Sequence, residues 1–171
     1  MFEIIFIIAA VAVRFLSLSI SMRNERRLRA EGAVEYGANA SKAIAAGHIA
    51  FYLAAITESY LTISSFTWVN GVGVGLYVFS ISVLFWVIAA LERLWTVKLY
   101  IAPDHCLQTS WLFKRFRHPN YFLNILPELV GFAIALNAWR TLLILGPVYV
   151  VILSIRIRQE EQIMRETFPQ Y

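Results

Sequence analysis

The amino-acid sequence predicts an all-α fold, an integral membrane bundle of about five transmembrane helices in a single domain, residues 1–171. Hydrophobic residues make up 59% of the chain, and the mean hydropathy is +0.63, whereas soluble domains are only about 45–50% apolar. The apolar residues gather in runs long enough to cross a hydrocarbon core about 30 Å thick. Lys and Arg concentrate in alternate segments between these runs. Together, these observations favour a polytopic membrane protein over a soluble one.

The first apolar run extends from Phe2 to about Ser21 and contains Arg14. No basic segment precedes it, so a retained helix is expected rather than a cleaved signal peptide. The Arg-rich segment that follows would not be tolerated in lipid, and we expect a loop or an interfacial helix there. The tail after the last run is helical by pattern and soluble by charge. The expected spans are residues 2–21, 43–61, 69–91, 121–138 and 141–157.

The connections that follow the first, third and fifth runs are rich in Lys and Arg, and the other two carry almost none. Under the positive-inside rule, this alternation places the N-terminus outside and the C-terminus in the cytoplasm. In the third run, Gly71, Gly73 and Gly75 lack the preceding strand of a dinucleotide-binding loop. We expect close helix packing through Gly71 and Gly75 instead.

Composition also excludes several kinds of partner. The formal net charge is +4 and the isoelectric point is about 9.4, but the cations lie between apolar runs rather than on a basic face, so no nucleic-acid partner is expected. Cys106 is the single cysteine, which excludes an intramolecular disulfide and a cysteine metal cluster. His48, His105 and His118 lack the spacing of metal ligands, so no metal is expected.

The first candidate constellation is "DHCLQTSWLFKRFRHPNY", residues 104–121, between the third and fourth runs. Pro119 disfavours a helical conformation at His118 and suits the first turn of the helix that follows. His118 and Asn120 are therefore expected at a helix N-terminus, where free N–H groups and the helix dipole favour an anionic group. The alternative is an interfacial belt in which Arg117 and His118 face lipid headgroups.

The second constellation is the pair Arg156 and Glu160, which are four residues apart and so share a helix face. Arg156 falls at the inner end of the fifth run, where a guanidinium can point into a protein cavity as readily as into water. The alternative is an ordinary surface ion pair, which contributes little to stability.

The third constellation is a polar stripe of Tyr121, Asn124 and Glu128 along the fourth run, spaced by three and four. An unpaired carboxylate below the interface costs several kcal/mol, so Glu128 is expected to face the bundle and find a partner. Glu128 has two alternative roles, a buried structural hydrogen bond or a contact with the substrate. Pro127 beside it is expected to kink the helix.

The sequence "RHPNY" at residues 117–121, followed by "RIRQEEQIMRETF" at residues 156–168, resembles the isoprenylcysteine carboxyl methyltransferase family of integral-membrane enzymes that use S-adenosylmethionine. The resemblance covers about residues 95–171. The segment "RNERRLRAEGAVEYG", residues 23–37, is similar to the short bacterial branch, some members of which are implicated in O-methylation of lipophilic alkylpyrones. The resemblance therefore implies a bacterial cytoplasmic membrane as the location.

The resemblance implies a cytoplasmic pocket for S-adenosylmethionine, formed by the segment before the fourth helix and by the C-terminal helix. It implies catalytic roles for Glu160, beside the cofactor, and for Arg156, toward the reacting group. The acceptor would be a lipophilic small molecule or a prenylated substrate that enters from the bilayer, with Arg156 as a substrate-binding residue. From the polar stripe, Asn124 and Glu128 are the other candidate substrate-binding residues. The cofactor-binding residues would be His105, Cys106, Leu107, Gln108, Phe113, His118, Pro119, Asn120, Tyr121 and Glu160.

This chain departs from the eukaryotic pattern of the family at Trp111 to Phe113, which replace a Gly-Val-Tyr segment, at Pro169, and in stopping at Tyr171. A carboxylate or acidic enol acceptor is already ionised near neutral pH, so no strong base is needed, and Arg156 can orient it with a two-pronged hydrogen bond. The alternatives are a phospholipid or amine N-methyltransferase, which would need a base, and a noncatalytic membrane lipid-binding protein.

Overall fold

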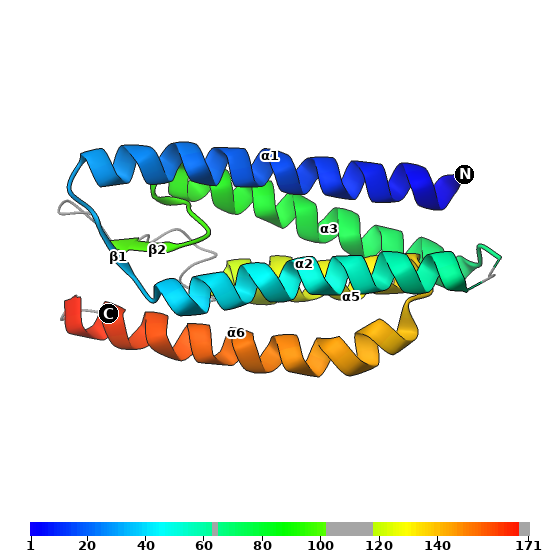
Figure 1. Cartoon of the computed structure of the whole chain (residues 1–171). Helices are drawn as coiled ribbons and strands as arrows, with labels where there is room; N and C mark the ends of the chain where they lie inside the picture. The colour runs from blue at the N-terminus through cyan, green and yellow to red at the C-terminus, as the bar shows by residue number, and fades with distance from the viewer. Residues whose placement is uncertain (63–64, 102–117, 168–171) are drawn as a thin grey trace.

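The computed structural model describes residues 1–62, 65–101 and 118–167, and its long helices run lengthwise along one bundle (Figure 1). The chain passes back and forth, so that the two termini lie at opposite ends of the bundle (Figure 1). The expected all-α membrane bundle is confirmed. The elements are α1 (Phe2–Ala30), β1 (Val34–Tyr36), α2 (Ala38–Leu61), α3 (Trp68–Leu91), η1 (Glu92–Leu94), β2 (Leu99–Ile101), η2 (Asn120–Ile125), α5 (Leu126–Ala135) and α6 (Trp139–Thr167).

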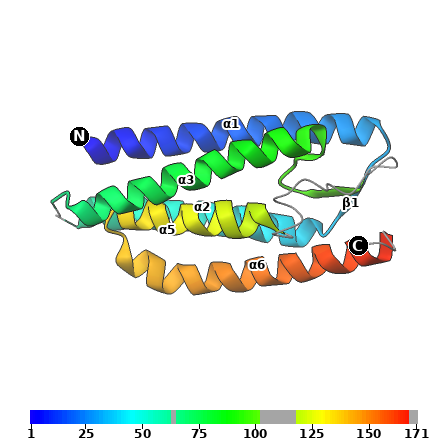
Figure 2. The same cartoon turned by 180° about the vertical axis from the view of Figure 1, so that it is seen from behind.

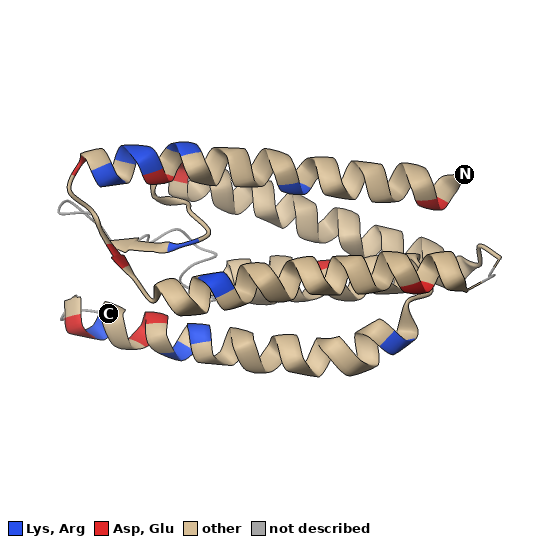
Figure 3. Cartoon of the chain, in the orientation of Figure 1, with Lys and Arg blue, Asp and Glu red and all other residues tan. Residues whose placement is uncertain are grey.

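Four helices, α1, α2, α3 and α6, are long and apolar enough to cross a membrane. Their outer faces carry large apolar side chains, such as Ile4, Leu53 and Leu143, which are 64%, 61% and 73% exposed. An apolar outer surface of this kind suits hydrocarbon as the surrounding solvent. Lys and Arg gather mainly at the end of the bundle that carries β1, β2 and the C-terminus (Figure 3).

The fourth apolar run forms a shorter helix, in which the six residues of η2 lead into the ten residues of α5. This helix packs against α2, α3 and α6 (Figure 2). It ends at Ala135 rather than at the expected Ala138, because Asn137 adopts a positive φ of 56° and Ala138 N–H donates back to the Ala133 carbonyl at 2.8 Å. Asn is one of the few residues that tolerate this left-handed conformation at a helix end.

Two helices extend beyond the spans expected from the sequence. α1 continues to Ala30, so the first half of the Arg-rich segment is an extension of the first helix rather than a loop. α6 continues to Thr167, so the last span and the described part of the charged tail form one helix. Hydrophobicity marks where lipid begins, but not where a helix stops, because charged residues are good helix formers in water.

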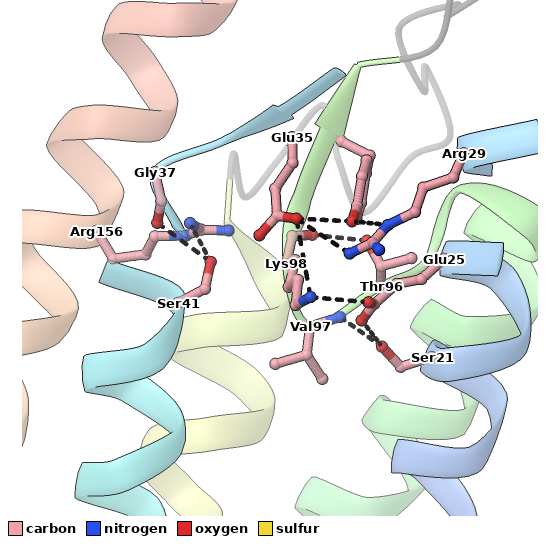
Figure 4. A network of polar contacts seen from close by, with 11 residues as sticks. Ser21, Glu25, Arg29, Glu35, Gly37, Ser41, Thr96, Val97, Lys98 and Arg156 are labelled. Carbon is pink, nitrogen blue, oxygen red and sulfur yellow. Dashed lines mark hydrogen bonds and ion pairs between the residues drawn. The ribbon is translucent and has the colours of Figure 1, made fainter. Parts of the chain in front are cut away.

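A short sheet was not expected from the sequence. β1 and β2 pair antiparallel with Glu35 opposite Tyr100, and strands of three residues are too short to show an alternating pattern. Lys98 Nζ lies 3.1 Å from Glu25 Oε2 and 3.8 Å from Glu35 Oε2, which ties the sheet to α1 (Figure 4). A hydrogen bond with Glu25 raises the pKa of Lys98 despite some desolvation.

Helices α3 and α5 pack closely against one another through Gly73 and Gly131. A Cβ atom on Gly131 would lie 2.6 Å from the Tyr77 backbone nitrogen, and one on Gly73 would overlap the α5 backbone. Gly71 and Gly75 have open space beside them. The expectation of close packing through Gly71 and Gly75 is therefore wrong, although close packing through a glycine of the same sequence is present. Small residues four apart allow a close approach but do not fix which face of the helix makes it.

Glu128 is fully buried in α5 and forms an ion pair with Arg14 of α1. Arg14 Nε donates to Glu128 Oε1 at 2.6 Å, and the Tyr52 hydroxyl of α2 donates to the same oxygen at 2.5 Å. His48 Nε2 lies 3.4 Å from it, and His48 Nδ1 lies 3.3 Å from the hydroxyl of Tyr149 in α6. The expectation that Glu128 faces the bundle and finds a partner is confirmed. We call Arg14, His48, Tyr52 and Glu128 the buried polar cluster.

We predict that Glu128→Ala lowers the free energy of unfolding by about 3–5 kcal/mol, because it leaves the Arg14 charge unpaired inside the bundle. The double variant Arg14→Met, Glu128→Leu should lose less free energy of unfolding than the sum of the losses in Arg14→Met and in Glu128→Leu, since neither charge is then left alone. Denaturation of the detergent-solubilised protein, followed by circular dichroism, measures both quantities. Additive losses would contradict the pairing.

Candidate active site

Arg156 forms the centre of a polar site at the charged end of the bundle. It projects from α6 and is only 2% exposed. Its Nη1 donates to Ser41 Oγ of α2 at 3.0 Å, and its Nε donates to the Tyr121 hydroxyl of η2 at 3.3 Å (Figure 4 shows the Ser41 contact). Its Nη2 has no partner among the described residues. A guanidinium held on one side in this way keeps hydrogen-bond donors for a further acceptor.

Gly37 and Ser41 at the start of α2 help to place this guanidinium. Gly37 adopts a positive φ of 59°, and its carbonyl accepts from the Ser41 hydroxyl at 3.3 Å. A Cβ atom on Gly37 would lie 3.3 Å from Arg156 Nη1, so a larger residue would crowd the arginine. Sequence reasoning missed both residues. Their role depends on a contact between positions 115 residues apart, for which a single sequence gives no signal.

Glu160 lies one turn after Arg156, with its Oε2 3.9 Å from Arg156 Nε. The Tyr121 hydroxyl donates to Glu160 Oε2 at 2.6 Å, so Tyr121 bridges the arginine and the carboxylate. The predicted shared face of Arg156 and Glu160 is therefore present. Because Arg156 is buried and both residues also contact η2, this is not an ordinary exposed surface pair.

His118 stands between two carboxylates of α6. Its Nδ1 lies 3.6 Å from Glu160 Oε1, and its Nε2 lies 3.3 Å from Glu161 Oε1. Burial opposes a charge on the ring, but the contacts with Glu160 and Glu161 outweigh it and raise the pKa of His118. Both ring nitrogens can donate only when the imidazole is protonated. Glu161 was missed by sequence reasoning, although it adjoins Glu160 in the chain.

The residues of the polar stripe in the fourth run contact two different sets of partners, one at the candidate active site and one in the buried polar cluster. In an ideal α-helix, Tyr121 and Glu128 would lie on one face, about 20° apart. Instead, η2 is a π-helix, in which Leu126 N–H donates to the Tyr121 carbonyl five residues back. Tyr121 contacts Arg156 and Glu160, whereas Glu128 contacts Arg14 and Tyr52. Pro127 lies in the first turn of α5, so the helix irregularity precedes it.

The remaining predicted site residues fall into two groups. Pro119 is buried beside His118, and Asn120 Oδ1 accepts from Asn124 Nδ2 at 2.9 Å. Asn124 Oδ1 is buried with no hydrogen-bond partner among the described residues. No group of three potential metal ligands occurs in residues 1–62, 65–101 and 118–167. Outside the described residues lie His105, Cys106, Leu107, Gln108 and Phe113.

The fold and this site define a membrane-embedded helical protein with a buried arginine, a tyrosine and a histidine–carboxylate cluster at one end of its bundle. Residues 73–166 match the family described as "Isoprenylcysteine carboxyl methyltransferase (ICMT) family", and the chain belongs to this family. The match includes every site residue named above except Gly37 and Ser41. The protein is therefore a membrane methyltransferase.

Two bacterial relatives align over nearly the whole chain. A protein of Haemophilus influenzae, described as uncharacterized, is 47% identical over 93% of this chain and 92% of its own length. The Bacillus subtilis protein YpbQ, also described as uncharacterized, is 28% identical over 91% of this chain and 92% of its own length. No solved structure shows significant similarity to the chain.

We predict that His118 stabilises the fold in a pH-dependent way. Its pKa is raised in the folded protein, so its contribution is fully present below the unfolded value of about 6.5 and is lost as the pH rises through the folded value. The difference in melting temperature between the parent and His118→Gln should shrink over that interval, as measured in detergent from pH 5 to 8. A difference that does not change with pH would contradict a charged His118.

Proposed function

We propose that this methyltransferase transfers the methyl group of S-adenosylmethionine to an oxygen of a lipophilic acceptor, either a carboxylate or an acidic enol. The observation that carries the proposal is the buried Arg156, some of whose hydrogen-bond donors have no acceptor among the described residues. A cationic side chain excluded from water in this way favours an anionic ligand. A planar guanidinium can bind such an oxyanion through two parallel hydrogen bonds.

The described carboxylates near Arg156 do not fully neutralise its charge. Glu160 is the nearest described carboxylate, but its Oε2 is 3.9 Å from Arg156 Nε and already accepts the Tyr121 hydroxyl hydrogen bond at 2.6 Å. Glu160 therefore neutralises Arg156 only through a long ion pair. An acceptor oxyanion at Nη2 would complete the charge balance at shorter range.

The same residues fit S-adenosylmethionine, whose sulfonium supplies an electrophilic methyl group. The carboxylate of Glu160 is suited to a positively charged part of the cofactor, the face of Tyr121 is suited to its adenine ring or its sulfonium, and the ring of His118 is suited to stacking with the adenine. The two rings are near parallel, with centroids 5.7 Å apart. The Tyr121 and Phe122 N–H groups at the start of η2 already donate to the His118 carbonyl, at 3.1 Å and 3.2 Å, so they are not free to bind the carboxylate of the cofactor.

No strong general base is required for an acceptor that is already ionised near neutral pH. Methyl transfer is an in-line displacement, and its rate depends on alignment and on exclusion of water. In this proposal, Ser41 and Tyr121 hold Arg156 in one orientation, and Arg156 holds the acceptor oxygen. An amine acceptor would need a base and would not be attracted to a guanidinium.

The lipophilic part of the acceptor would enter between helices from the bilayer. Asn124 Oδ1 is buried without a hydrogen-bond partner in the described part of the chain, which makes it a second point at which a polar part of the substrate can be held. Glu128 is already engaged by Arg14, Tyr52 and His48, so its role in substrate binding stays a prediction.

Arg156→Lys tests the acceptor side, because it keeps the charge but loses the planar fork. We predict that it lowers the rate of methyl transfer by about 100-fold, the scale for losing one oriented donor in an active site, with little change in cofactor affinity. Glu160→Gln should instead act mainly on the cofactor, with cofactor affinity falling about tenfold. Arg158→Lys is the matched control, because Arg158 is exposed on the same helix.

The measurements are transfer from labelled S-adenosylmethionine into lipid extract, mass spectrometry of the methylated products, and calorimetric cofactor binding in detergent. Activity of Arg156→Lys equal to that of Arg158→Lys would remove Arg156 from the acceptor site. Methylated amines among the products would favour the N-methyltransferase alternative. Absence of cofactor binding by the parent would favour the noncatalytic lipid-binding alternative.

We also propose that the protein lies in the bacterial cytoplasmic membrane with its N-terminus outside and its charged end in the cytoplasm, because Lys and Arg gather at that end. In a Cys106→Ser background, a cysteine at the exposed position Arg165 should react only with membrane-permeant reagents. A cysteine at Tyr60, which is 88% exposed at the other end, should react with impermeant ones. The reverse labelling pattern would overturn this orientation.

A further inference from the structure

A second polar site lies on α1, on the side of the bundle away from the Arg156 site. A surface cavity of about 440 Å³ opens between the charged end of α1 and the turn at η1. α1 and α6 run along opposite edges of the bundle in both views (Figures 1 and 2). The lining residues are Ile20, Arg23, Asn24, Arg27, Glu92 and Arg93.

The cavity carries more positive than negative charge. Three of its lining residues are arginines and one, Glu92, is acidic. Arg27 and Arg93 both contact Glu31, at 3.0 Å and 2.6 Å. Arg23, one turn before Arg27 on the same face of α1, has no hydrogen-bond or ion-pair partner among the described residues. Like charges four residues apart destabilise a helix, so an anion between them would relieve a repulsion.

The walls of this cavity are fixed by contacts that need no ligand. Asn24 Nδ2 donates to the carbonyl oxygens of Glu92 at 2.9 Å and Trp95 at 2.8 Å, which fastens α1 to η1. Ile20 packs against the apolar cluster that contains Trp95. A binding site that is already formed loses little entropy when a ligand enters.

The polarity of the cavity changes along α1 as it does across a lipid headgroup. Ile20 ends the apolar part of the helix, and Arg23 and Arg27 follow at helical spacing on the same face. Glycerol and the first acyl carbons of a phospholipid would contact Ile20, while its phosphate would lie between the two guanidiniums. Arg binds phosphate oxygens through paired, charge-assisted hydrogen bonds. A free phosphate ion would use only the arginines.

We propose that this cavity binds the phosphate group of an anionic phospholipid, with Arg23 and Arg27 as its ligands and Ile20 as its apolar contact. The site is separate from the methyltransferase site, and the proposal does not depend on the identity of the methyl acceptor. It differs from general attraction of basic segments to anionic membranes, because it assigns the binding to particular arginines.

The test uses the full chain in nanodiscs that contain equal amounts of phosphatidylglycerol and phosphatidylcholine, with the retained lipids counted by native mass spectrometry. The parent should retain phosphatidylglycerol preferentially. Arg23→Gln should reduce the ratio of retained phosphatidylglycerol to phosphatidylcholine about tenfold, the scale of one lost charge-assisted hydrogen bond. Arg23 is exposed, so circular dichroism should show an unchanged helix content.

Arg26→Gln is the matched control, because Arg26 is an exposed arginine at the same level of α1 that does not line the cavity. It should retain phosphatidylglycerol as the parent does. Equal losses in Arg23→Gln and Arg26→Gln, or no loss in either, would overturn the proposal in favour of general attraction. Displacement of phosphatidylglycerol by excess inorganic phosphate, at matched ionic strength, would identify a free phosphate site and overturn the lipid assignment.

Discussion

The ion pair between Arg14 and Glu128 is the constraint on which the rest of the bundle depends. A single charge in hydrocarbon is costly, so neither side chain can be placed without the other. Their contact joins α1 to α5, Tyr52 adds α2 through the same carboxylate oxygen, and His48 extends the set to Tyr149 of α6. The outer faces of the long helices are apolar and interact with lipid without preference for one rotation. The polar cluster therefore determines which faces turn inward.

The position of α5 in turn sets the geometry of the candidate active site. The glycines of α3 and α5 bring these helices close together, and η2 carries Tyr121 toward α6. Arg156 is then held by groups from two other elements, since Ser41 comes from α2 and Tyr121 from η2. Because a mobile guanidinium would lose part of its binding energy in becoming ordered, an arginine already held by its neighbours is the better anion ligand.

The sequence was sufficient for features that depend on local pattern and was insufficient for those that depend on which segments meet. Hydropathy located the long helices, and the spacing of Arg156 and Glu160 placed them on one face. The cost of burying Glu128 showed that it must be paired, but not that Arg14 is its partner, because that contact joins positions 114 residues apart. Ser41, the short sheet and the choice of Gly73 over its neighbours were missed for the same reason. The polar stripe did not place Tyr121 and Glu128 on one helix face, because an α-helical period was assumed across a segment that is a π-helix.

That π-helix also makes the length of the fourth helix important. A π turn is equivalent to an α-helix with one inserted residue, and such insertions are common at functional sites. Because of this inserted residue, Tyr121 and Glu128 are related as residues six apart in an α-helix are, about 120° from one another, although they are seven apart in sequence. Deletion of a single codon between Tyr121 and Ile125 would remove the π turn and leave six α-helical steps between them, so the first half of the segment would not rotate relative to α5. Glu128 would keep its contact with Arg14, and Tyr121 would keep its direction toward Arg156 and Glu160. A homologue with a one-residue gap in this segment can therefore share the arrangement of the candidate active site, whereas a homologue with a regular α-helix of unchanged length cannot.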